Sequence, residues 1–233
     1  MIVIITGATK GIGRAIAEKF AEGGHTIVAC ARNINDLTEM EIAFKQQFQL
    51  ATLYKKAVDL STKEGAIDFG CWLIDEKLIP DVLVNNAGSF LPGSIYNEKD
   101  GTLEKMMDIN LYSAYHLTRT LLPVMIENRS GHIFNMCSIA SLQAYNNGGA
   151  YSISKFALLG FSKNLREEMK PHGIKVTAVC PGAVMSASWE GSDIDPNRIM
   201  EAKDIANMVY AAVHLSPMAV VEDIVMRPQL GDL

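Results

Sequence analysis

Short apolar runs alternate with helix-like segments along the whole chain, and this alternation is the feature that most limits the fold. The first run, residues 2–5, reads Ile-Val-Ile-Ile and ends at a glycine-rich turn, after which apolar residues recur with helical spacing. Uninterrupted apolar runs of this length are typical of strands buried on both faces of a parallel sheet. Similar runs follow at 26–30, 52–58, 81–84, 132–136, 174–179 and 220–226.

Helical periodicity fills the segments between these runs. Helices are predicted from Ile12 to about Gly23, and then over 35–48, 62–77, 101–128, 151–170 and 203–215. Seven strands alternating with six helices and no linker predict a single doubly wound α/β domain over residues 1–233, with a parallel sheet of about seven strands and helices on both faces. Ligands bind such sheets beyond the carboxyl ends of the strands. Residues 186–198 carry few periodic apolar positions and are predicted to be a mobile loop.

Charge and cysteine usage exclude several function classes. A net charge of -5 argues against a nucleic-acid partner, because such a surface needs a basic patch. No apolar run approaches the roughly 18 residues that a membrane span requires, and the N-terminus is a poor signal peptide. The four cysteines are widely spaced and form no metal-ligand motif or disulfide framework, which favours reduced thiols in the cytoplasm: Cys30, Cys71, Cys137 and Cys180.

The turn after the first run has the glycine spacing G-x-x-x-G-x-G, at Gly7, Gly11 and Gly13. A strand, a glycine-rich turn and a helix together form a phosphate-binding arrangement. Glycines let the backbone approach a pyrophosphate, and the helix N-terminus offers free N–H donors with the positive end of its dipole. The alternative is that a tight turn simply needs glycine.

The end of the second predicted strand indicates which dinucleotide the turn would bind. An acidic residue there would bind the ribose 2′-hydroxyl, whereas this chain has Ala31-Arg32-Asn33. Lys10 in the glycine turn would supply a second cation to a 2′-phosphate, so the pattern favours NADP over NAD. The alternative is two solvated surface cations. Asp59, just past the third strand, either accepts from the adenine amino group or is a turn or capping residue.

Tyr151 and Lys155 stand four residues apart in a predicted helix and therefore share one face. A nearby cation favours the phenolate, so Lys155 is predicted to lower the pKa of Tyr151 from its usual value of about 10. The phenol would then exchange a proton near neutrality, which general acid–base catalysis requires. Alone, the pair would more often be two residues on an exposed helix face.

These residues, in this order, resemble the classical short-chain dehydrogenase/reductase family, of the NADP-preferring type, over essentially the whole length. The matching pieces are the turn TGATKGIG, the tetrapeptide NNAG at 85–88, Asn110 within a helix, Ser138, the Tyr151 and Lys155 pair, and Pro181-Gly182. Ser138 and Tyr151 are 151 − 138 = 13 residues apart, as in the family pattern. The resemblance implies a Rossmann-like fold.

The resemblance also implies roles for individual residues. Tyr151 would be the general acid in carbonyl reduction and the base in alcohol oxidation. Lys155 would assist it and hold the nicotinamide ribose, Ser138 would bind the substrate oxygen, and Asn110 would hold a water of a proton relay. Asn85 is expected to be mainly structural. The implied NADP(H) contacts are Gly7, Thr9, Lys10, Gly11, Ile12, Arg32, Asp59, Asn86, Ala87, Gly88, Tyr151, Lys155, Pro181, Gly182, Val184 and Ser186.

The sequence also predicts a substrate class and an assembly. A mostly apolar pocket, on which no arginine converges, predicts a ketone or aldehyde of modest size; its expected walls are Ser138–Ala140, Tyr145, Phe90, Met185 and the loop with Trp189. Met185 and Trp189 would otherwise be ordinary packing residues. Apolar residues beyond one core-facing stripe, such as Leu117, Phe156 and Leu159, together with the resemblance, predict a homodimer or homotetramer.

Three other functions remain open at this stage. The alternatives are a catalytically silent NADP(H)-binding regulator, a 3-oxoacyl-carrier reductase-like enzyme, and an enzyme that catalyses dehydration or epimerisation on the same scaffold. Loss of Ser138, Tyr151 or Lys155 would have favoured the regulator, and all three are present. The C-terminus lacks the glycine-rich ending of typical ketoacyl-carrier reductases.

Overall fold

The seven apolar runs pair into one sheet. The computed structural model describes residues 1–185 and 195–232. Its strands are β1 (Ile2–Thr6), β2 (Thr26–Ala31), β3 (Thr52–Ala57), β4 (Val82–Asn85), β5 (His132–Met136), β6 (Lys175–Pro181) and β7 (Asp223–Met226). They are ordered β3-β2-β1-β4-β5-β6-β7, and all neighbouring pairs are parallel. The predicted α/β class is confirmed, and the strand order is Rossmann-like.

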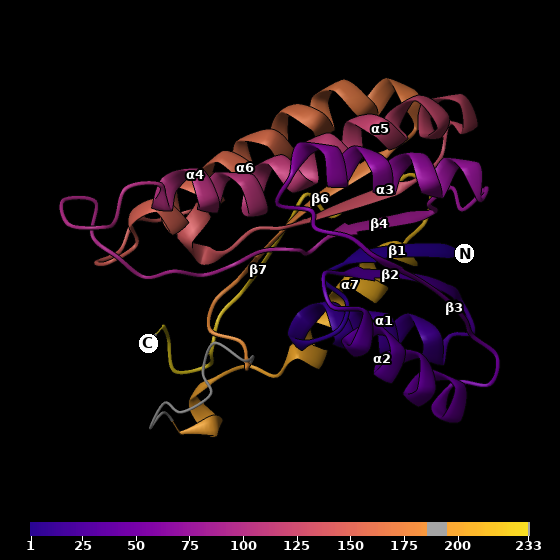
Figure 1. The fold of residues 1–233 in the computed structure, drawn as a ribbon, viewed down its shortest axis with the longest axis horizontal. Helices are drawn as coiled ribbons and strands as arrows, with labels where there is room; N and C mark the ends of the chain where they lie inside the picture. Colours follow the sequence, from indigo (N-terminus) through magenta and orange to yellow (C-terminus); the bar gives the residue numbers. More distant parts are fainter. Residues whose placement is uncertain (186–194, 233) are drawn as a thin grey trace.

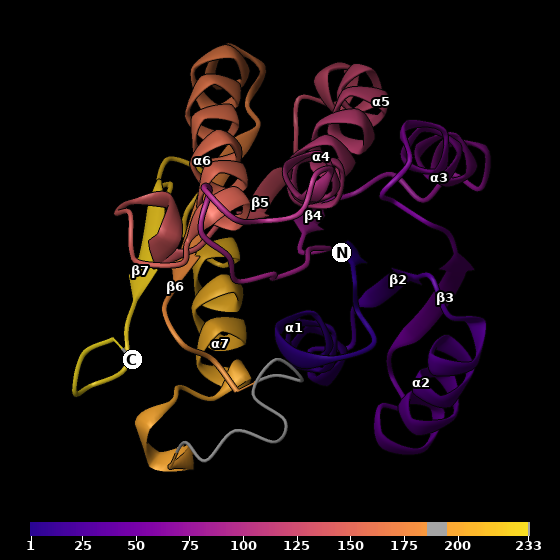
Figure 2. The ribbon, with the colours of Figure 1, turned by 60° about the vertical axis from the view of Figure 1, so that its left-hand side comes forward.

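Helices cover both faces of this sheet. They are α1 (Gly11–Glu22), α2 (Ile34–Gln47), α3 (Lys63–Asp75), α4 (Thr102–Met107), α5 (Ser113–Asn128), α6 (Gly149–Met169) and α7 (Ala202–Val213). Figures 1 and 2 show α3, α4, α5 and α6 on one face and α1, α2 and α7 on the other. No helix among the described residues is long and apolar enough to cross a lipid bilayer.

The strands read as continuous apolar runs because successive side chains enter different cores. In β1, Val3 and Ile5 belong to the core under α1 and α7, whereas Ile4 belongs to the core under α3 and α5. In β2, Ile27 and Val28 divide in the same way. Burial on both faces leaves no solvent-facing position in the middle of either strand, so the alternation typical of half-exposed strands is absent.

The helix predicted over 101–128 is interrupted. α4 passes into one π-helical turn, Asp108–Tyr112, before α5 begins. Asn110 lies in this turn and is 1% exposed. π turns inside helices are often found at functional sites, because the extra residue re-aims a side chain. The turn therefore explains why an asparagine is placed in a helix interior. α5 continues past Pro123 to Asn128.

The predicted ligand-binding edge forms at the strand ends. The chain passes from β3 at one edge of the sheet to β4 beside β1, so the order reverses between β1 and β4. Crevices at such reversals are where α/β sheets bind ligands. Gly7 follows β1, Asn86 follows β4, Ser138 lies just beyond β5, and Pro181 ends β6. Gly7, Asn86 and Pro181 are among the implied NADP(H) contacts, and Ser138 is the residue expected to bind the substrate oxygen.

His132, at the start of β5, gives the fold a predicted acid sensitivity. Its Nε2 lies 2.7 Å from Thr177 Oγ1, which itself donates to the carbonyl of Val221, so Nε2 carries the proton of a neutral imidazole. Burial, assisted by the charge of Lys175, lowers the pKa of His132 to about 3. The unfolded chain, with an ordinary histidine pKa of 6.5, therefore binds the proton more readily between these two values.

Stability from this neutral histidine is complete above pH 6.5 and is lost progressively as the pH falls toward 3. Between pH 7.5 and 5.5 the wild type is expected to lose about 1.4 kcal/mol more free energy of unfolding than His132→Gln does. Urea unfolding of both proteins at the two pH values measures this difference. Equal pH dependence in the two proteins would contradict the assignment.

Candidate active site

Two adjoining cavities follow the carboxyl edge of the sheet. Each has a volume of about 660 Å³, and both are lined by Gly88 and Ser89. One contains Lys10 and Arg32, which were predicted for the adenosine end of NADP, and three further implied NADP(H) contacts: Gly7, Thr9 and Ala87. The other contains the residues predicted for the chemistry, Ser138, Tyr151 and Lys155, and further implied NADP(H) contacts: Ile12, Asn86, Pro181, Gly182 and Val184. Most of the predicted residues therefore line two cavities that share Gly88 and Ser89, and the two cavities together are termed the groove.

The glycine turn has the geometry of an anion cradle. Gly7 and Gly11 have φ values of +63° and +54°, which side chains rarely adopt. A Cβ on Gly13 would lie 2.4 Å from the Gly7 carbonyl oxygen, so glycine is needed there for α1 to approach β1. α1 begins at Gly11; the preceding Lys10 gives it no side-chain cap, and its first turn contains no acidic residue. Its free N–H groups and dipole therefore suit a pyrophosphate.

The two asparagines of the NNAG tetrapeptide have different roles: one stabilises the sheet and the other lines the groove. Asn85 is buried and donates to Thr118 Oγ1 (3.0 Å) and Asn135 Oδ1 (2.8 Å), which agrees with a structural role. Asn86 lines the groove, and its amide also donates to the carbonyls of Thr6 and Gly7. The hydroxyl oxygen of Thr6 accepts from the backbone N–H groups of Asn86 and Ala87. These bonds fix the end of β4 against the glycine turn.

Asn110 holds the chain just after this tetrapeptide. Its Oδ1 accepts from the N–H of Ser89 (2.8 Å), and its Nδ2 donates to the carbonyl of Ser89 (3.0 Å) and to Ser154 Oγ (2.9 Å). A Cβ on Gly88 would lie 2.9 Å from this Oδ1 and 3.6 Å from Lys155 Nζ. The side-chain amide is committed to positioning Ser89, so the water predicted for Asn110 would need another of its atoms. Ser154, a partner not foreseen, lies three residues after Tyr151.

Ser138 lines the groove, and its hydroxyl has no acceptor among residues 1–185 and 195–232. Its Oγ accepts from the N–H of Ala140 (3.1 Å), and its own N–H donates to Ser141 Oγ (3.1 Å). This reciprocal cap starts a short 3₁₀ turn, Ile139–Ser141, and fixes the serine rotamer. Because Oγ acts as an acceptor in that bond, its hydrogen remains available for a substrate oxygen.

Tyr151 and Lys155 share the face of α6 that meets the groove. Lys155 Nζ lies 5.8 Å from the centroid of the Tyr151 ring and donates to the carbonyl of Met136 over 2.8 Å. Lys155 is only 6% exposed. The ring of Phe90 packs edge-on against Tyr151, with centroids 4.8 Å apart. Burial, together with the neighbouring Tyr151, raises the pKa of Tyr145 to about 12, so Tyr145 keeps its proton.

The two cations predicted for the adenosine end differ in their ion pairing. Lys10 Nζ lies 3.4 Å from Asp36 Oδ2, whereas Arg32 is exposed and forms no ion pair within the described part of the chain. Asp59 accepts from the N–H (3.0 Å) and the hydroxyl (2.8 Å) of Ser61, and these bonds lower the pKa of Asp59. Asp59 therefore acts as a turn residue in this structure. Asp59 does not line either cavity.

The far wall of the catalytic cavity corrects one prediction. No arginine was predicted in this cavity, but Arg227 lines it. Asp232 also lines the cavity and forms an ion pair with Arg227. Gly182 allows this approach, because a Cβ there would lie 3.3 Å from Asp232 Oδ1.

Phe90, Ala140 and Tyr145 line the cavity as predicted, but Met185 does not. Ser186 and Trp189 lie outside the described residues. Gly11 lines neither cavity and shapes the turn instead.

Comparisons with known proteins agree with this geometry. The family model for short chain dehydrogenase matches residues 1–196. An uncharacterized oxidoreductase of Staphylococcus epidermidis is 30% identical over 227 residues, covering 97% of this chain and 96% of the relative. Sepiapterin reductase of Chlorobaculum tepidum is 30% identical over 240 residues, covering 100% and 98%. The crystal structure of a metagenomic short-chain oxidoreductase in complex with NADP has a TM-score of 0.84 at 29% identity, covering 97% of this chain and 96% of that one.

Proposed function

The chain belongs to the short-chain dehydrogenase family, and on that premise we propose that it is an NADP(H)-dependent oxidoreductase that interconverts a carbonyl group and an alcohol. The observation that carries the proposal is the convergence of Ser138, Tyr151 and Lys155 on one cavity that continues into the glycine-turn cavity. The fit of a dinucleotide is supported by the uncapped start of α1 and the positive φ of Gly7. We propose residues 1–233 as one such domain.

The bound cofactor would supply or accept the hydride; the side chains would do the rest. Ser138 donates its free hydroxyl proton to the substrate oxygen and stabilises charge that develops there. Tyr151 donates a proton to the same oxygen in reduction and removes it in oxidation. The Lys155 ammonium, close to the Tyr151 ring, stabilises negative charge on the phenol oxygen and would hold the nicotinamide ribose of the bound cofactor. Asn110 keeps Ser89, and with it the cavity wall, in place.

An uncharged ketone or aldehyde of modest size remains the proposed substrate class. Arg227 is already paired with Asp232, so together they add no net charge to the cavity. The similarity to a sepiapterin reductase places sepiapterin in the substrate panel beside simple ketones, aldehydes and 3-oxoacyl thioesters. If a member of this panel gave a dehydrated or epimerised product in place of an alcohol, the protein would catalyse a different reaction on the same scaffold.

NADP is the proposed form of the cofactor because Arg32 at the end of β2 and Lys10 of the glycine turn line one cavity. Asp36 also lines it but pairs with Lys10, which leaves Arg32 as the cation without an ion pair among the described residues. Arg32→Ala is expected to raise the Kd for NADPH roughly 10- to 100-fold, since a guanidinium–phosphate bond is worth about 1.5–3 kcal/mol, and to leave the Kd for NADH almost unchanged. Fluorescence titration with both nucleotides measures this. Lys45→Ala, which removes an exposed cation of α2, is the control. Equal losses for the two nucleotides, or tighter binding of NADH by the wild type, would contradict the NADP assignment.

A homodimer or homotetramer is proposed on surface apolarity. Phe156 and Ile153 of α6 and Tyr112 beside α5 are exposed. Leu117 and Leu159, predicted to add to this surface, are instead core residues. Light scattering at micromolar concentration tests the assembly, and a monomer would contradict it. A cytoplasmic location is proposed from the four free thiols.

A further inference from the structure

The helix that carries Tyr151 begins without a cap of its own. Gly148 precedes α6 and offers no side-chain acceptor, and the first turn contains no acidic residue. The first N–H groups of a helix have no partner within the helix and need an outside acceptor. Ala150 finds one in Glu98, whose Oε2 accepts from its N–H over 3.3 Å. The acceptor thus comes from a different segment, the loop of residues 89–100 between β4 and α4.

This 89–100 loop is docked closely on the start of α6. Gly149 has a φ of +35°, and a Cβ there would lie 2.3 Å from the Gly93 carbonyl oxygen and 2.9 Å from Glu98 Oε2. The Gly93 N–H donates to the carbonyl of Asn147 (3.1 Å), and Ser94 Oγ donates to Asn147 Oδ1 (2.7 Å). Contact this close is possible only because residue 149 is glycine.

The same loop forms the cavity wall beside Tyr151. Its first residue, Ser89, is held by Asn110, and its second, Phe90, packs edge-on against the Tyr151 ring. The loop is therefore fixed at both ends to elements that carry the proposed catalytic residues. Glu98 supplies the second attachment. It is half-buried, whereas its neighbours Asn97 and Lys99 are exposed.

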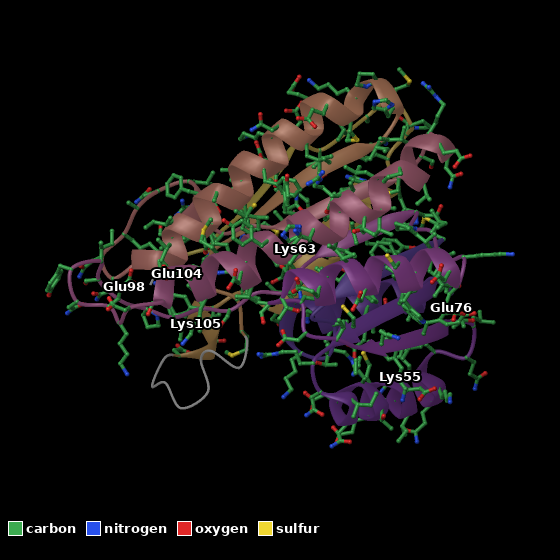
Figure 3. All side chains as sticks on the ribbon, turned by 45° about the horizontal axis from the view of Figure 1, so that its top comes forward. Lys55, Lys63, Glu76, Glu98, Glu104 and Lys105 are labelled. Atoms are coloured by element: carbon green, nitrogen blue, oxygen red, sulfur yellow. The ribbon has the colours of Figure 1, made fainter. Side chains whose placement is uncertain are left out.

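We propose that Glu98 is a positioning residue for the reaction: its carboxylate joins the 89–100 loop to the first turn of α6, so that Phe90 and Tyr151 keep their mutual orientation. A carboxylate suits this place, because the N-terminus of a helix carries the positive end of the dipole. Figure 3 labels Glu98 at the end of the molecule where α4 lies. The inference rests on the proposed function for its catalytic consequence, but not for the contact itself.

Three variants separate the acceptor, the charge and a general surface effect. Glu98→Ala removes both acceptor and charge, Glu98→Gln retains an acceptor oxygen, and Glu104→Gln removes an exposed charge of α4, also labelled in Figure 3, as a control. We expect kcat to fall roughly tenfold in Glu98→Ala, because misplacement of a reacting group by less than an ångström has effects of this order. Glu98→Gln should stay within about threefold of the wild type, and Glu104→Gln should equal it. An unchanged kcat in Glu98→Ala would overturn the proposal.

Two further readouts exclude a merely structural effect. A double-mutant cycle combines Glu98→Ala with Phe90→Ala. Expressed as activation free energies, the loss in kcat of the double mutant should be smaller than the sum of the two single losses, because both changes act on the same contact. Additive losses would overturn the proposal. Amide hydrogen exchange of residues 149–153 and 89–100 should accelerate together in Glu98→Ala and not in Glu104→Gln. Should the wild type turn over no carbonyl, the proposed function fails, while the exchange experiment still decides whether Glu98 holds the two segments together.

Discussion

Replacement of Tyr151 with phenylalanine is expected to lower kcat about 10³-fold, because general acid–base groups contribute about 10²–10⁴-fold and the phenylalanine ring has no proton to donate. The Kd for NADPH should stay within about twofold, since only one oxygen atom is removed. The phenylalanine ring can keep the edge-on contact with Phe90. Steady-state turnover and nucleotide titration of Tyr151→Phe measure both quantities.

Tyr145→Phe is the matched control, because Tyr145 lines the same cavity and has the same side chain. Burial raises the pKa of Tyr145 to about 12, which keeps its proton bound and makes it a poor base. Its kcat should therefore change less than about tenfold. An active Tyr151→Phe, or an equal loss in Tyr145→Phe, would show that the proton passes through another group.

Lys155→Met is expected to separate activity from stability. The ammonium is 6% exposed, and its single hydrogen bond within the described part of the chain is to the carbonyl of Met136. Methionine preserves most of the volume and removes a buried charge, which is often neutral or stabilising, although the Met136 carbonyl loses its donor. The free energy of unfolding should therefore change by no more than about 1 kcal/mol.

Turnover should nevertheless fall about 10³-fold in Lys155→Met, because the cation beside Tyr151 is lost. Urea unfolding and steady-state kinetics on the same preparation test both statements. Lys163→Met, on the same helix but paired with Asp223 at the surface, is the control and should keep its turnover. A Lys155→Met protein that retains turnover would contradict the role given to this residue; one that unfolds early would show that the lysine is mainly structural.

Much of the fold is predictable because local patterns agree with the tertiary structure. Every apolar run became a strand, since residues such as Val3 and Ile4 are buried on opposite faces of one sheet. The site edge followed from the same reasoning, because residues directly after parallel strands must meet at one edge. Lys10, Arg32 and Ser138, which follow strands, could therefore be assigned to this edge from the sequence, whereas Tyr151 lies in α6 and was assigned to the site by the family resemblance.

The remaining features depend on contacts between distant segments. Arg227 reaches the cavity because β7 pairs Met226 with Pro181, a register that no local pattern encodes. The π turn at Asn110 depends on the partners Ser89 and Ser154, which lie on other elements. Glu98 had no recognisable signal in its neighbourhood, since its role appears only when the loop meets Ala150. Asp59 carried a signal compatible with two roles, and only the turn is visible.

The most direct test is to incubate the wild-type protein with NADPH and the carbonyl panel and to measure nucleotide consumption together with alcohol formation. We expect oxidation of NADPH with formation of one equivalent of alcohol for at least one uncharged ketone or aldehyde. Tight binding of NADPH without consumption on any member of the panel would contradict it, and would indicate a protein that senses the nucleotide without turning it over.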